Sequence, residues 1–472
     1  MRKTKIICTM GPAVDSDEMI EKLIDIGMDC ARFNFSHGSH EEQHERMERV
    51  RRVSKRVGSH TALLLDTKGP EIRMKDFVGG KVELKRGQEF TLDADEATDG
   101  DNTRIALTYH ELYKYVKPGV VILADDGKLS MTVDRIEGEK VVCIINNDAP
   151  LSNHKSINIP NCDIPMPFIS DVDRSDILFG IEEGVDFIAA SFVRSADDVL
   201  ALRELLDENG GHGIKIISKI ESTGGMQNFN EILKVTDGVM VARGDLGVEI
   251  PIARVPSVQK TIIQRCIQAG VFVVTATQML ESMIHAPAPT RAEVSDIANA
   301  IYDGTTCIML SGETAAGEYP IEAVTTMRNV CLETEANINY TERFKRTDLV
   351  LDKTVLDATC NAAVSAAEYL DAKAIVVVSQ TGRTVSRLAD FYPGCPIIAG
   401  IVSERGRRQM NLGFNVKPMD AEKLDSVDQL VEYSKKIALE AAFLNKGDTV
   451  IIVTGSGVNN KTTSDTMKID TL

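Results

Sequence analysis

The sequence lacks the features that mark secreted or membrane proteins. Its nine cysteines are an odd number without any C-x-x-C pair, and most lie inside apolar runs. We therefore interpret them as small buried residues in a reducing cytosol rather than as disulfides or metal ligands. No apolar run approaches membrane-spanning length. The short apolar part of MRKTKIICTM meets Gly11-Pro12 too early for a signal peptide. We expect a cytoplasmic protein.

Positive charge is also in short supply. The chain has 53 Lys and Arg against 70 Asp and Glu, a formal net charge of −17. This balance argues against nucleic acid or an anionic membrane surface as a partner. Anionic substrates must therefore be held by local positive charge. The sequence also contains no internal repeat and no low-complexity segment.

Strand-like and helix-like segments alternate along most of the 472 residues, which indicates parallel strands joined by helical crossovers. Helix starts are signalled by Asp15 with Glu18, Ser39 with Glu42 and Thr290 with Glu293. The predicted strands lie at 4–10, 30–36, 61–68, 186–192, 214–221, 237–245, 271–279 and 305–313. Eight such units predict an α/β protein with a (β/α)₈ TIM barrel, whose active site lies at the carboxyl ends of the strands.

The alternation is interrupted between about Met74 and Pro167. Short alternating segments with turn signals at 86–87, 126–127 and 137–138 follow one another without a long amphipathic helix. We expect an inserted antiparallel β-barrel domain at 71–167, with the TIM barrel formed by 1–70 and 168–345. The remaining residues, 346–472, predict a separate C-terminal α/β domain.

The stretch IKIISKIE carries the most informative charges. Lys219 and Glu221 lie two positions apart, so both side chains emerge on one face at the end of a strand. Asp245 ends the next predicted strand and adds a second carboxylate. Two carboxylates suit Mg²⁺, and the lysine would supply positive charge to a phosphoryl group in transit. The alternative is a solvated salt bridge at a strand end.

Other strand ends carry similar groups. These hydroxyls, carboxylates and amides are hard oxygen ligands suited to Mg²⁺ or an alkali cation rather than Zn²⁺. Arg32 and Arg73 can bind phosphate or carboxylate in bidentate fashion, and Gly244 lets backbone N–H groups approach an anion. Together they predict phosphoryl transfer. The strand-end residues are Arg32, Asn34, Ser36, Asp66, Thr67, Lys219, Glu221, Gly244, Asp245, Thr277 and Glu313.

Some features have a simpler structural explanation. His37 follows a strand end and could contact a nucleotide, but loop histidines are more often merely solvated. Glu313 could simply pair with a neighbouring cation. Near the C-terminus, the stretch from Gly455 to Thr462 almost matches a P-loop and a dinucleotide fingerprint, but Asn460 replaces a required Gly and too few residues follow. That loop could still cradle a phosphate, as could Ser379–Thr384 at a helix N-terminus.

Several long motifs closely resemble the pyruvate kinase family, and they cover essentially the whole chain in order. The resemblance implies transfer of phosphate from phosphoenolpyruvate to ADP, giving pyruvate and ATP. It also implies that the inserted domain is a lid, and that the chain is of the bacterial type without an extra C-terminal phosphotransfer-like domain. The motifs are NFSHG at 34–38, DTKGPEIR at 66–73, ISKIE at 217–221, MVARGDLGVEIP at 240–251, ATQMLESM at 276–283, PTRAEVSD at 289–296 and MLSGETAAGEYP at 309–320.

The resemblance also implies residue roles. Glu221 and Asp245 resemble the ligands of the essential Mg²⁺ or Mn²⁺, Lys219 the residue that stabilises the phosphoryl group, and Thr277 a residue near the enolate. The implied K⁺ site is Asn34, Ser36, Asp66 and Thr67; implied substrate contacts are Arg32, Lys219, Gly244, Asp245 and Thr277; implied nucleotide contacts are Asn34, His37 and Arg73. A sugar phosphate or nucleotide effector would bind the C-terminal domain at Ser379, Thr381, Gly382, Arg383 and Thr384, in a homotetramer.

Glu71 matches members of the family that need K⁺ rather than those with Lys at this position.

Two other function classes stay open on the residues alone. A barrel with a lysine at a strand end could be a Schiff-base aldolase or lyase, and the chain could be a metabolite-binding protein that has lost catalysis. No motif position is degraded, which disfavours the second.

Overall fold

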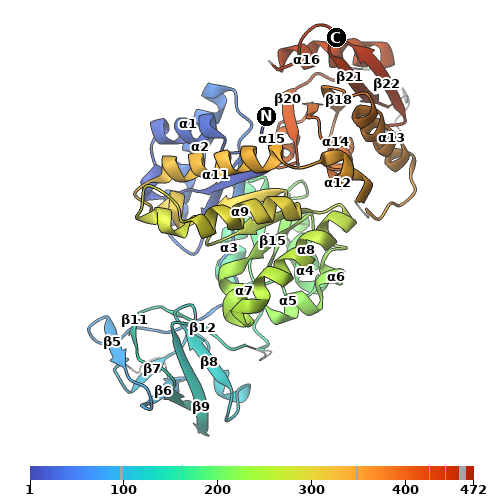
Figure 1. The fold of residues 1–472 in the computed structure, drawn as a ribbon. Helices are drawn as coiled ribbons and strands as arrows, with labels where there is room; N and C mark the ends of the chain where they lie inside the picture. Colours follow the sequence, from blue (N-terminus) through green and yellow to red (C-terminus); the bar gives the residue numbers. More distant parts are fainter. Residues whose placement is uncertain are drawn as a thin grey trace.

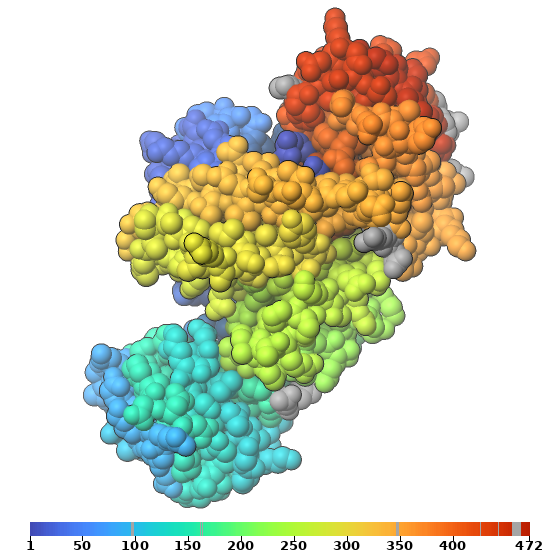
Figure 2. All heavy atoms as spheres, in the orientation of Figure 1, coloured from blue at the N-terminus to red at the C-terminus, as the bar shows by residue number. Residues whose placement is uncertain are grey.

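The computed structural model describes the chain apart from residues 96–98, 161, 163, 347–348, 425, 442 and 456–463. It has three parts, a central barrel, a β domain attached at one end of the barrel and an α/β domain at the other (Figure 1). In the space-filling view, the β domain projects from the barrel as a separate lobe (Figure 2). No helix among the described residues is long and apolar enough to cross a membrane.

The central barrel is closed by eight parallel strands, which confirms the predicted TIM barrel. Nearly all of their residues are buried, as expected for strands covered on both faces. The strands close in the order β1-β17-β16-β15-β14-β13-β3-β2. They are β1 (Lys5–Thr9), β2 (Cys30–Asn34), β3 (Ala62–Asp66), β13 (Phe187–Ala190), β14 (Lys215–Ile220), β15 (Gly238–Ala242), β16 (Phe272–Ala276) and β17 (Cys307–Leu310).

Several helices around the barrel begin at capping boxes, in which a Ser or Thr side chain and an acidic residue three positions on satisfy free N–H groups. The boxes predicted at Ser39 and Thr290 are present. The predicted cap at Asp15 is wrong, because Ser16 accepts the hydrogen bond from Met19 N–H. The helices are η1 (Pro12–Val14), α1 (Asp17–Ile26), α2 (His40–Val57), α3 (Asp171–Glu182), α4 (Ala196–Glu208), α5 (Thr223–Gln227), α6 (Phe229–Ile232), α7 (Arg243–Glu249), η3 (Ile252–Arg254), α8 (Val255–Ala269), η4 (Glu281–Ile284), α9 (Arg291–Asp303), α10 (Gly312–Ala315) and α11 (Pro320–Ala336).

The inserted domain is built from short strands around its own apolar core. Its larger sheet has the order β4-β12-β8-β9-β10-β6-β7, and β11 pairs with β5. The predicted antiparallel pairing holds except between β6 and β7, which are parallel. The elements are β4 (Ile72–Arg73), β5 (Lys81–Leu84), β6 (Glu89–Asp93), β7 (Arg104–Ala106), η2 (Leu112–Lys114), β8 (Val121–Ala124), β9 (Leu129–Glu137), β10 (Lys140–Ile145), β11 (Ala149–Ser152) and β12 (Ser156–Asn158).

The C-terminal domain is the predicted α/β unit. Four parallel strands and the antiparallel edge strand β22 form a sheet in the order β20-β19-β18-β21-β22. Helix α12 (Tyr340–Arg346) precedes it. The elements are α13 (Val355–Tyr369), β18 (Ala374–Ser379), α14 (Arg383–Asp390), β19 (Ile397–Ile401), α15 (Glu404–Met410), β20 (Val416–Asp420), α16 (Val427–Glu440), β21 (Thr449–Thr454) and β22 (Thr466–Thr471).

Helix α15 and the loop after it close the N-terminal end of the barrel. Leu412 packs with the side chains that fill the barrel interior. Arg408 Nε lies 3.0 Å from both carboxylate oxygens of Asp186, which is fully buried before β13. Gln409 Nε2 donates to the carbonyls of Asp186 and Gly213. These contacts cover the barrel end opposite to the carboxyl ends of the strands.

Candidate active site

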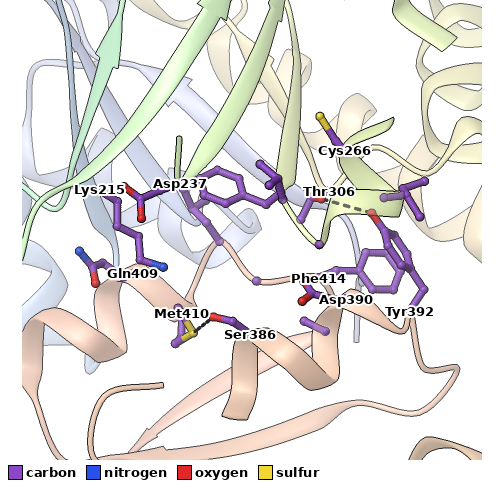
Figure 3. Close-up of a pocket in the computed structure, with 17 residues that line it drawn as sticks. Lys215, Asp237, Cys266, Thr306, Ser386, Asp390, Tyr392, Gln409, Met410 and Phe414 are labelled. Carbon is purple, nitrogen blue, oxygen red and sulfur yellow. Dashed lines mark hydrogen bonds between the residues drawn. The ribbon is translucent and has the colours of Figure 1, made fainter. Parts of the chain in front are cut away.

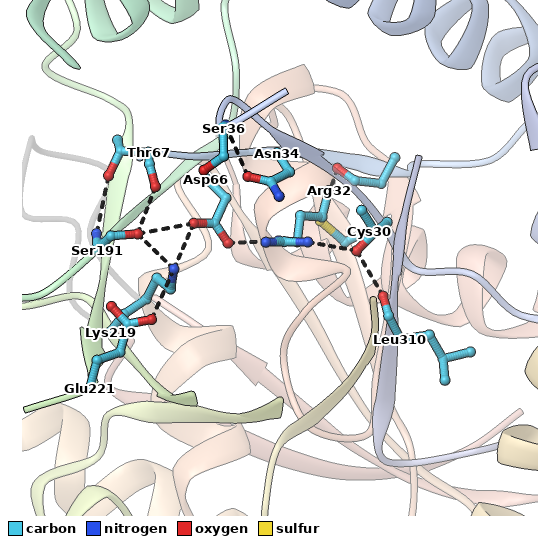
Figure 4. Close-up of polar contacts among 12 residues, drawn as sticks. Cys30, Arg32, Asn34, Ser36, Asp66, Thr67, Ser191, Lys219, Glu221 and Leu310 are labelled. Atoms are coloured by element: carbon cyan, nitrogen blue, oxygen red, sulfur yellow. Dashed lines mark hydrogen bonds and ion pairs between the residues drawn. The ribbon is translucent and has the colours of Figure 1, made fainter. Parts of the chain in front are cut away.

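The carboxyl ends of β2, β3 and β14 bring a buried lysine and two carboxylates together (Figure 4). Lys219 Nζ donates to Asp66 Oδ1 at 2.9 Å and to Ser191 Oγ at 2.6 Å. It also lies 3.1 Å from Glu221 Oε1. Both carboxylates are 1 % exposed. The ammonium is therefore held between two buried carboxyl groups, and the alternative of a solvated salt bridge is wrong.

A second cation binds the other oxygen of the same carboxylate. Arg32 Nε donates to Asp66 Oδ2 at 2.6 Å, and Arg32 Nη1 donates to Thr9 Oγ1 at 2.9 Å. Thr9 Oγ1 in turn donates to Leu310 O. The result is a chain of hydrogen bonds from β17 across β1, β2 and β3 to β14 (Figure 4), which fixes both cations on the rim.

The charges shift one another's protonation. Burial by itself lowers the pKa of Lys219, but the carboxylates of Asp66 and Glu221 outweigh it and hold that pKa above its ordinary value. Burial alone would raise the pKa of Asp66, yet Arg32 and Lys219 hold it below its ordinary value. Lys219 and Asp66 are therefore both charged at neutral pH, as a fixed ion pair requires.

Glu221 is oriented by the backbone but is left partly unsatisfied. Its Oε2 accepts the N–H of Phe192 at 2.7 Å, and Phe192 adopts a φ of 54°, rare for a bulky residue. Its Oε1 is buried and accepts no hydrogen bond from the described residues. Burial raises the pKa of Glu221 to about 8, with the Lys219 ammonium opposing the shift and the Asp245 carboxylate adding to it.

Gly244 and Asp245 lie in the first turn of helix α7 rather than in a strand. The predicted strand 237–245 is too long, since β15 ends at Ala242. The Gly244 N–H donates to Thr277 Oγ1 at 2.8 Å. The Asp245 carboxylate is partly exposed and has no ion-pair partner among the described residues. An acidic side chain in a first helical turn is stabilised by the helix dipole.

The turn after β16 stores backbone strain. Thr277 and Gln278 have φ values of 66° and 53°, and a β-branched residue at positive φ is an outlier. Arg243 holds this turn: its Nη2 donates to the Thr277 carbonyl at 2.6 Å and to the Gln278 carbonyl at 3.2 Å. Asp296 binds Arg243 Nη1 at 2.5 Å. Such strain persists only where the surroundings enforce it, and it clusters at functional sites.

We expect Thr277→Gly to be more stable than Thr277→Ala. Both variants lose the Oγ1 that accepts from Gly244, so their difference isolates the strain at φ 66°. Gly adopts positive φ freely and should gain about 1 kcal/mol over Ala, the reverse of their order in a helix. Urea unfolding of the two variants measures the difference. Equal stability, or a more stable Ala variant, would show that this turn is unstrained.

Glu313 pairs with no cation among the described residues, so the alternative of a simple ion pair finds no support there. It is fully buried, and its Oε1 and Oε2 accept the N–H groups of Leu280 at 3.0 Å and Ser311 at 2.7 Å. It thereby ties the strained loop after β16 to the loop after β17. We therefore assign Glu313 a structural role, which is to hold these two loops together beside the rim.

The four residues of the implied K⁺ site lie near one another at the ends of β2 and β3 (Figure 4). Asn34 Oδ1 accepts the N–H of Ser36 at 3.1 Å. Thr67 Oγ1 accepts the N–H of Ser191 at 3.1 Å. The Asp66 carboxylate is shared with Arg32 and Lys219, as described above. Among the described residues, no group of three or more His, Cys, Asp or Glu side chains is arranged to hold a metal.

Two of the implied nucleotide contacts, Arg73 and His37, make no direct contact with the group around Lys219 and Asp66 among the described residues. Arg73 pairs with Glu71, whose Oε2 accepts from Nη2 at 2.5 Å, and Arg73 Nη1 donates to the His154 carbonyl at 2.9 Å. Burial raises the pKa of Glu71, with Arg73 opposing and Asp245 adding to the shift. His37 is exposed. A cleft of about 550 Å³, to which Glu71 contributes, separates the β domain from the barrel.

The implied effector residues lie around the N-terminus of α14. The Gly382 N–H donates to Ser379 Oγ at 3.0 Å, and Gly382 has a φ of 86°. Thr381 and Arg383 are exposed, whereas Thr384 is buried with its Oγ1 2.7 Å from Ser464 Oγ. Of the glycine-rich motif at 455–462, all but its first residue lies outside the described residues.

Sequence reasoning missed three residues of the site. Ser191 bonds to both Lys219 and Asp66, and it lies at the end of a predicted strand, so the rule applied to the other strands would have found it. Thr9 orients Arg32 and lies near the end of the first strand. Arg243 was not among the predicted site residues. Its partners come from β16 and α9, and no local signal in the sequence reveals them.

The fold and the site together define a (β/α)₈-barrel enzyme whose polar groups gather at the carboxyl ends of the strands. Family models narrow the class. The model "Pyruvate kinase, barrel domain" matches residues 1–324, and "Pyruvate kinase, alpha/beta domain" matches residues 357–470. The chain therefore belongs to the pyruvate kinase family, and the predicted resemblance is confirmed.

Individual relatives agree with this assignment. The pyruvate kinase of Clostridium perfringens is 47% identical over 458 residues, covering 96% of each chain. That of Clostridium acetobutylicum is 45% identical and covers 99% of each. The Sporosarcina psychrophila enzyme is 46% identical, and the match covers 99% of this chain and 80% of that protein. The crystal structure of a pyruvate kinase from Cryptosporidium parvum has a TM-score of 0.94 at 39% identity, covering 100% of this chain and 96% of that one.

Proposed function

We propose that the protein transfers the phosphoryl group of phosphoenolpyruvate to ADP, giving pyruvate and ATP. The observation that carries this proposal is the Lys219 ammonium, fixed between two buried carboxylates at the barrel rim. A fixed cation in a site of low dielectric stabilises the charge of a phosphoryl group in transit without reorganising during the reaction. Membership of the pyruvate kinase family supports the same reaction.

The protonation of Lys219 argues against a Schiff-base aldolase. A Schiff-base lysine must lose its proton to act as a nucleophile, and such lysines have a lowered pKa. Here the two carboxylates raise the pKa of Lys219 instead. Borohydride should therefore trap no carbonyl substrate on this residue.

Glu221 and Asp245 fit a divalent cation, Mg²⁺ or Mn²⁺. Glu221 Oε1 is a buried oxygen without a hydrogen bond from the described residues, and the Asp245 carboxylate lies close enough to shift its pKa. Mg²⁺ commonly takes one or two carboxylates and fills its remaining positions with water and substrate oxygens. When bound, the ion would neutralise charge on the phosphoryl group and on the developing enolate.

We expect the affinity for Mg²⁺ to fall as the pH is lowered below about 8, the raised pKa of Glu221. The ion binds the carboxylate form, so below this pH it must displace a proton, and affinity should drop by up to about tenfold per pH unit. Calorimetric titration in buffers of different ionisation heat counts the released protons. Glu221→Gln should abolish both binding and proton release, while the exposed Glu231→Gln should keep both. Affinity independent of pH would contradict this role of Glu221.

Asn34, Ser36, Asp66 and Thr67 are proposed to hold K⁺. Their oxygen atoms are hard ligands, and one of them is a charged carboxylate. Asp66 would then serve both cations of the rim as well as the bound ion. Glu71 is in keeping with a dependence on K⁺, as the family resemblance implies.

The remaining rim residues would position the substrates. Arg32 is fixed by Asp66 and Thr9, which leaves part of its guanidinium fork for phosphate. The N–H groups at Gly244 and Asp245 would hold the substrate carboxylate at the start of α7, and Thr277 would lie near the enolate. Asn34, His37 and Arg73 are proposed for the nucleotide. To bind phosphate, Arg73 would have to release Glu71. We propose that this exchange occurs when the lid closes.

The C-terminal domain is proposed to bind a sugar phosphate or nucleotide at Ser379, Thr381, Gly382, Arg383 and Thr384. The exposed Thr381 and Arg383, and the start of α14, which no side chain of the described residues caps, support an anion site. We further propose domain boundaries at 1–70 with 168–345, 71–167 and 346–472, a homotetramer, and a cytoplasmic location.

A coupled assay of ATP formation from phosphoenolpyruvate and ADP tests this function. It should be run with and without Mg²⁺, with and without K⁺, and with a panel of sugar phosphates and AMP. We expect activity only with the divalent ion, stimulation by K⁺, and activation by one phosphorylated metabolite that is lost in Arg383→Ala. Absence of ATP formation under all conditions would instead favour a metabolite-binding protein.

A further inference from the structure

The end of the barrel opposite to the catalytic groups contains a cavity of about 140 Å³ (Figure 3). Its walls come from the starts of β14 and β16 and from helices α14 and α15 of the C-terminal domain. Apolar side chains such as Phe272, Leu412 and Phe414 make up much of the lining. An apolar cavity with a few polar groups is the usual form of a site for a small molecule.

One charged group in this cavity is unpaired. Lys215 begins β14, and its side chain extends toward α14 and α15 (Figure 3). Among the described residues, its ammonium has no hydrogen-bond acceptor and no ion-pair partner. Burial lowers the pKa of Lys215, with partial compensation from the charges of Asp237 and Asp390. Lys215 is partly buried. A cation that has no partner among the described residues is unfavourable beside apolar walls, and an anion in the cavity would relieve it.

The two acidic side chains in the lining have partners of their own. Asp237 accepts from Arg203 Nη2 at 2.6 Å and from the Ile216 N–H at 2.9 Å. Asp390 accepts from Arg387 Nη1 at 3.3 Å. Burial raises the pKa of Asp390 to about 7, so its carboxyl is protonated part of the time at neutral pH and repels an anion less.

The hydroxyl and amide groups of the lining are also engaged. Tyr392 Oη donates to the Gly304 carbonyl at 2.8 Å, Ser386 Oγ donates to Met410 Sδ, and both donors of Gln409 reach backbone carbonyls. Among the residues that the structure describes, the cavity thus offers one free cation and apolar walls, but not the several donors that a phosphate dianion requires. Its volume limits the ligand further, because a cavity of about 150 Å³ in another protein takes up benzene, with about six heavy atoms.

We propose that this cavity binds a small monocarboxylate with a short apolar chain, about six heavy atoms in all, whose carboxylate pairs with Lys215. The site is distinct from the proposed effector residues at 379–384 and from the active site. Lys215 and Lys219 lie on the same strand with Ile217 between them in the barrel interior. A ligand on Lys215 would therefore contact the strand that carries the catalytic lysine, at its other end.

Calorimetric titration of the full-length protein with butanoate tests the proposal, with butanamide, butylammonium and inorganic phosphate as comparisons. We expect saturable binding of butanoate with a Kd of about 1 mM and no binding of the other three. Lys215→Met should weaken butanoate binding about ten- to a hundredfold, and Lys215→Arg should retain it. The exposed Lys234→Met is the matched control.

Two further measurements distinguish binding in this cavity from binding at other sites. Ser386→Leu should fill the cavity from α14 and block butanoate while leaving Lys215 in place. Butanoate bound at the active site would be unaffected by Lys215→Met, and that result would overturn the proposal. Equal binding of butanamide, binding of phosphate in preference to butanoate, or no binding of butanoate to the wild-type protein would overturn it as well. Lys215→Met removes an unpaired charge, so the variant should fold, and a thermal melt checks this.

Discussion

Lys219→Met is expected to collapse turnover while leaving the binding of phosphoenolpyruvate largely intact. The ammonium is held at the rim by Asp66 Oδ1 and Ser191 Oγ. Its charge stabilises the phosphoryl group most strongly in the transition state. An interaction made only in the transition state affects kcat rather than ground-state binding. Removing one such preorganised group typically costs about 10²–10³-fold in kcat.

The ground state has other contacts that this variant keeps. Arg32 remains paired with Asp66 and tied to Thr9, and the helix start at Gly244 is untouched. KM for phosphoenolpyruvate should therefore change little. Steady-state kinetics in the coupled assay measure both constants, and direct titration with phosphoenolpyruvate checks binding.

Two control variants sharpen the result. Lys234→Met removes an exposed lysine that pairs with Glu231 on a surface helix turn, and it should leave both constants unchanged. Lys219→Arg keeps the charge but changes its shape, and because a guanidinium does not replace a compact ammonium, kcat should recover only in part. A Lys219→Met enzyme with near-normal kcat, or one with a raised KM at unchanged kcat, would refute the assigned role.

The sequence predicted the barrel well because its signals are local. Each strand is a short segment of mostly apolar residues, and a helix start such as Ser39 with Glu42 is a motif of only four residues. Once eight parallel strands are known, their carboxyl ends must meet on one rim. The gathering of Arg32, Asp66 and Lys219 follows from that geometry alone.

What the sequence did not reveal depends on contacts between distant segments. Glu313 was expected to be a strand-end ligand or the partner of a cation, yet it accepts hydrogen bonds from backbone N–H groups of two loops. Arg243 holds the strained turn at Thr277 by donating to backbone carbonyl groups. Every residue has such a carbonyl, so the sequence does not show which ones Arg243 contacts. The boundary between β15 and α7 was misplaced because the helix starts without a polar cap, at Ala242.

The second large effect is expected for Asp66→Asn, which should lower the free energy of unfolding by about 3–5 kcal/mol. The substitution preserves shape and removes only the charge. It leaves Arg32 and Lys219, each 9 % exposed, as buried cations without their shared anion. Urea unfolding measures the loss, and kcat should fall too because Lys219 is no longer fixed. As a control, Asp17→Asn removes a carboxylate that pairs with arginines at the surface and should lower the free energy of unfolding far less than Asp66→Asn does.

A double variant separates charge imbalance from a general loss of packing. If the penalty of Asp66→Asn arises from uncompensated cations, then Lys219→Met should remove part of it, since only one of the two cations, Arg32, is then left without its anion. The two substitutions should therefore be non-additive, with the double variant more stable than the sum predicts by about 1–3 kcal/mol. Additive losses would mean that Asp66 stabilises the rim through shape and hydrogen bonds alone. In that case the Arg32–Asp66–Lys219 arrangement would be no electrostatic unit, and the fixed charge proposed for phosphoryl transfer would lose its structural basis.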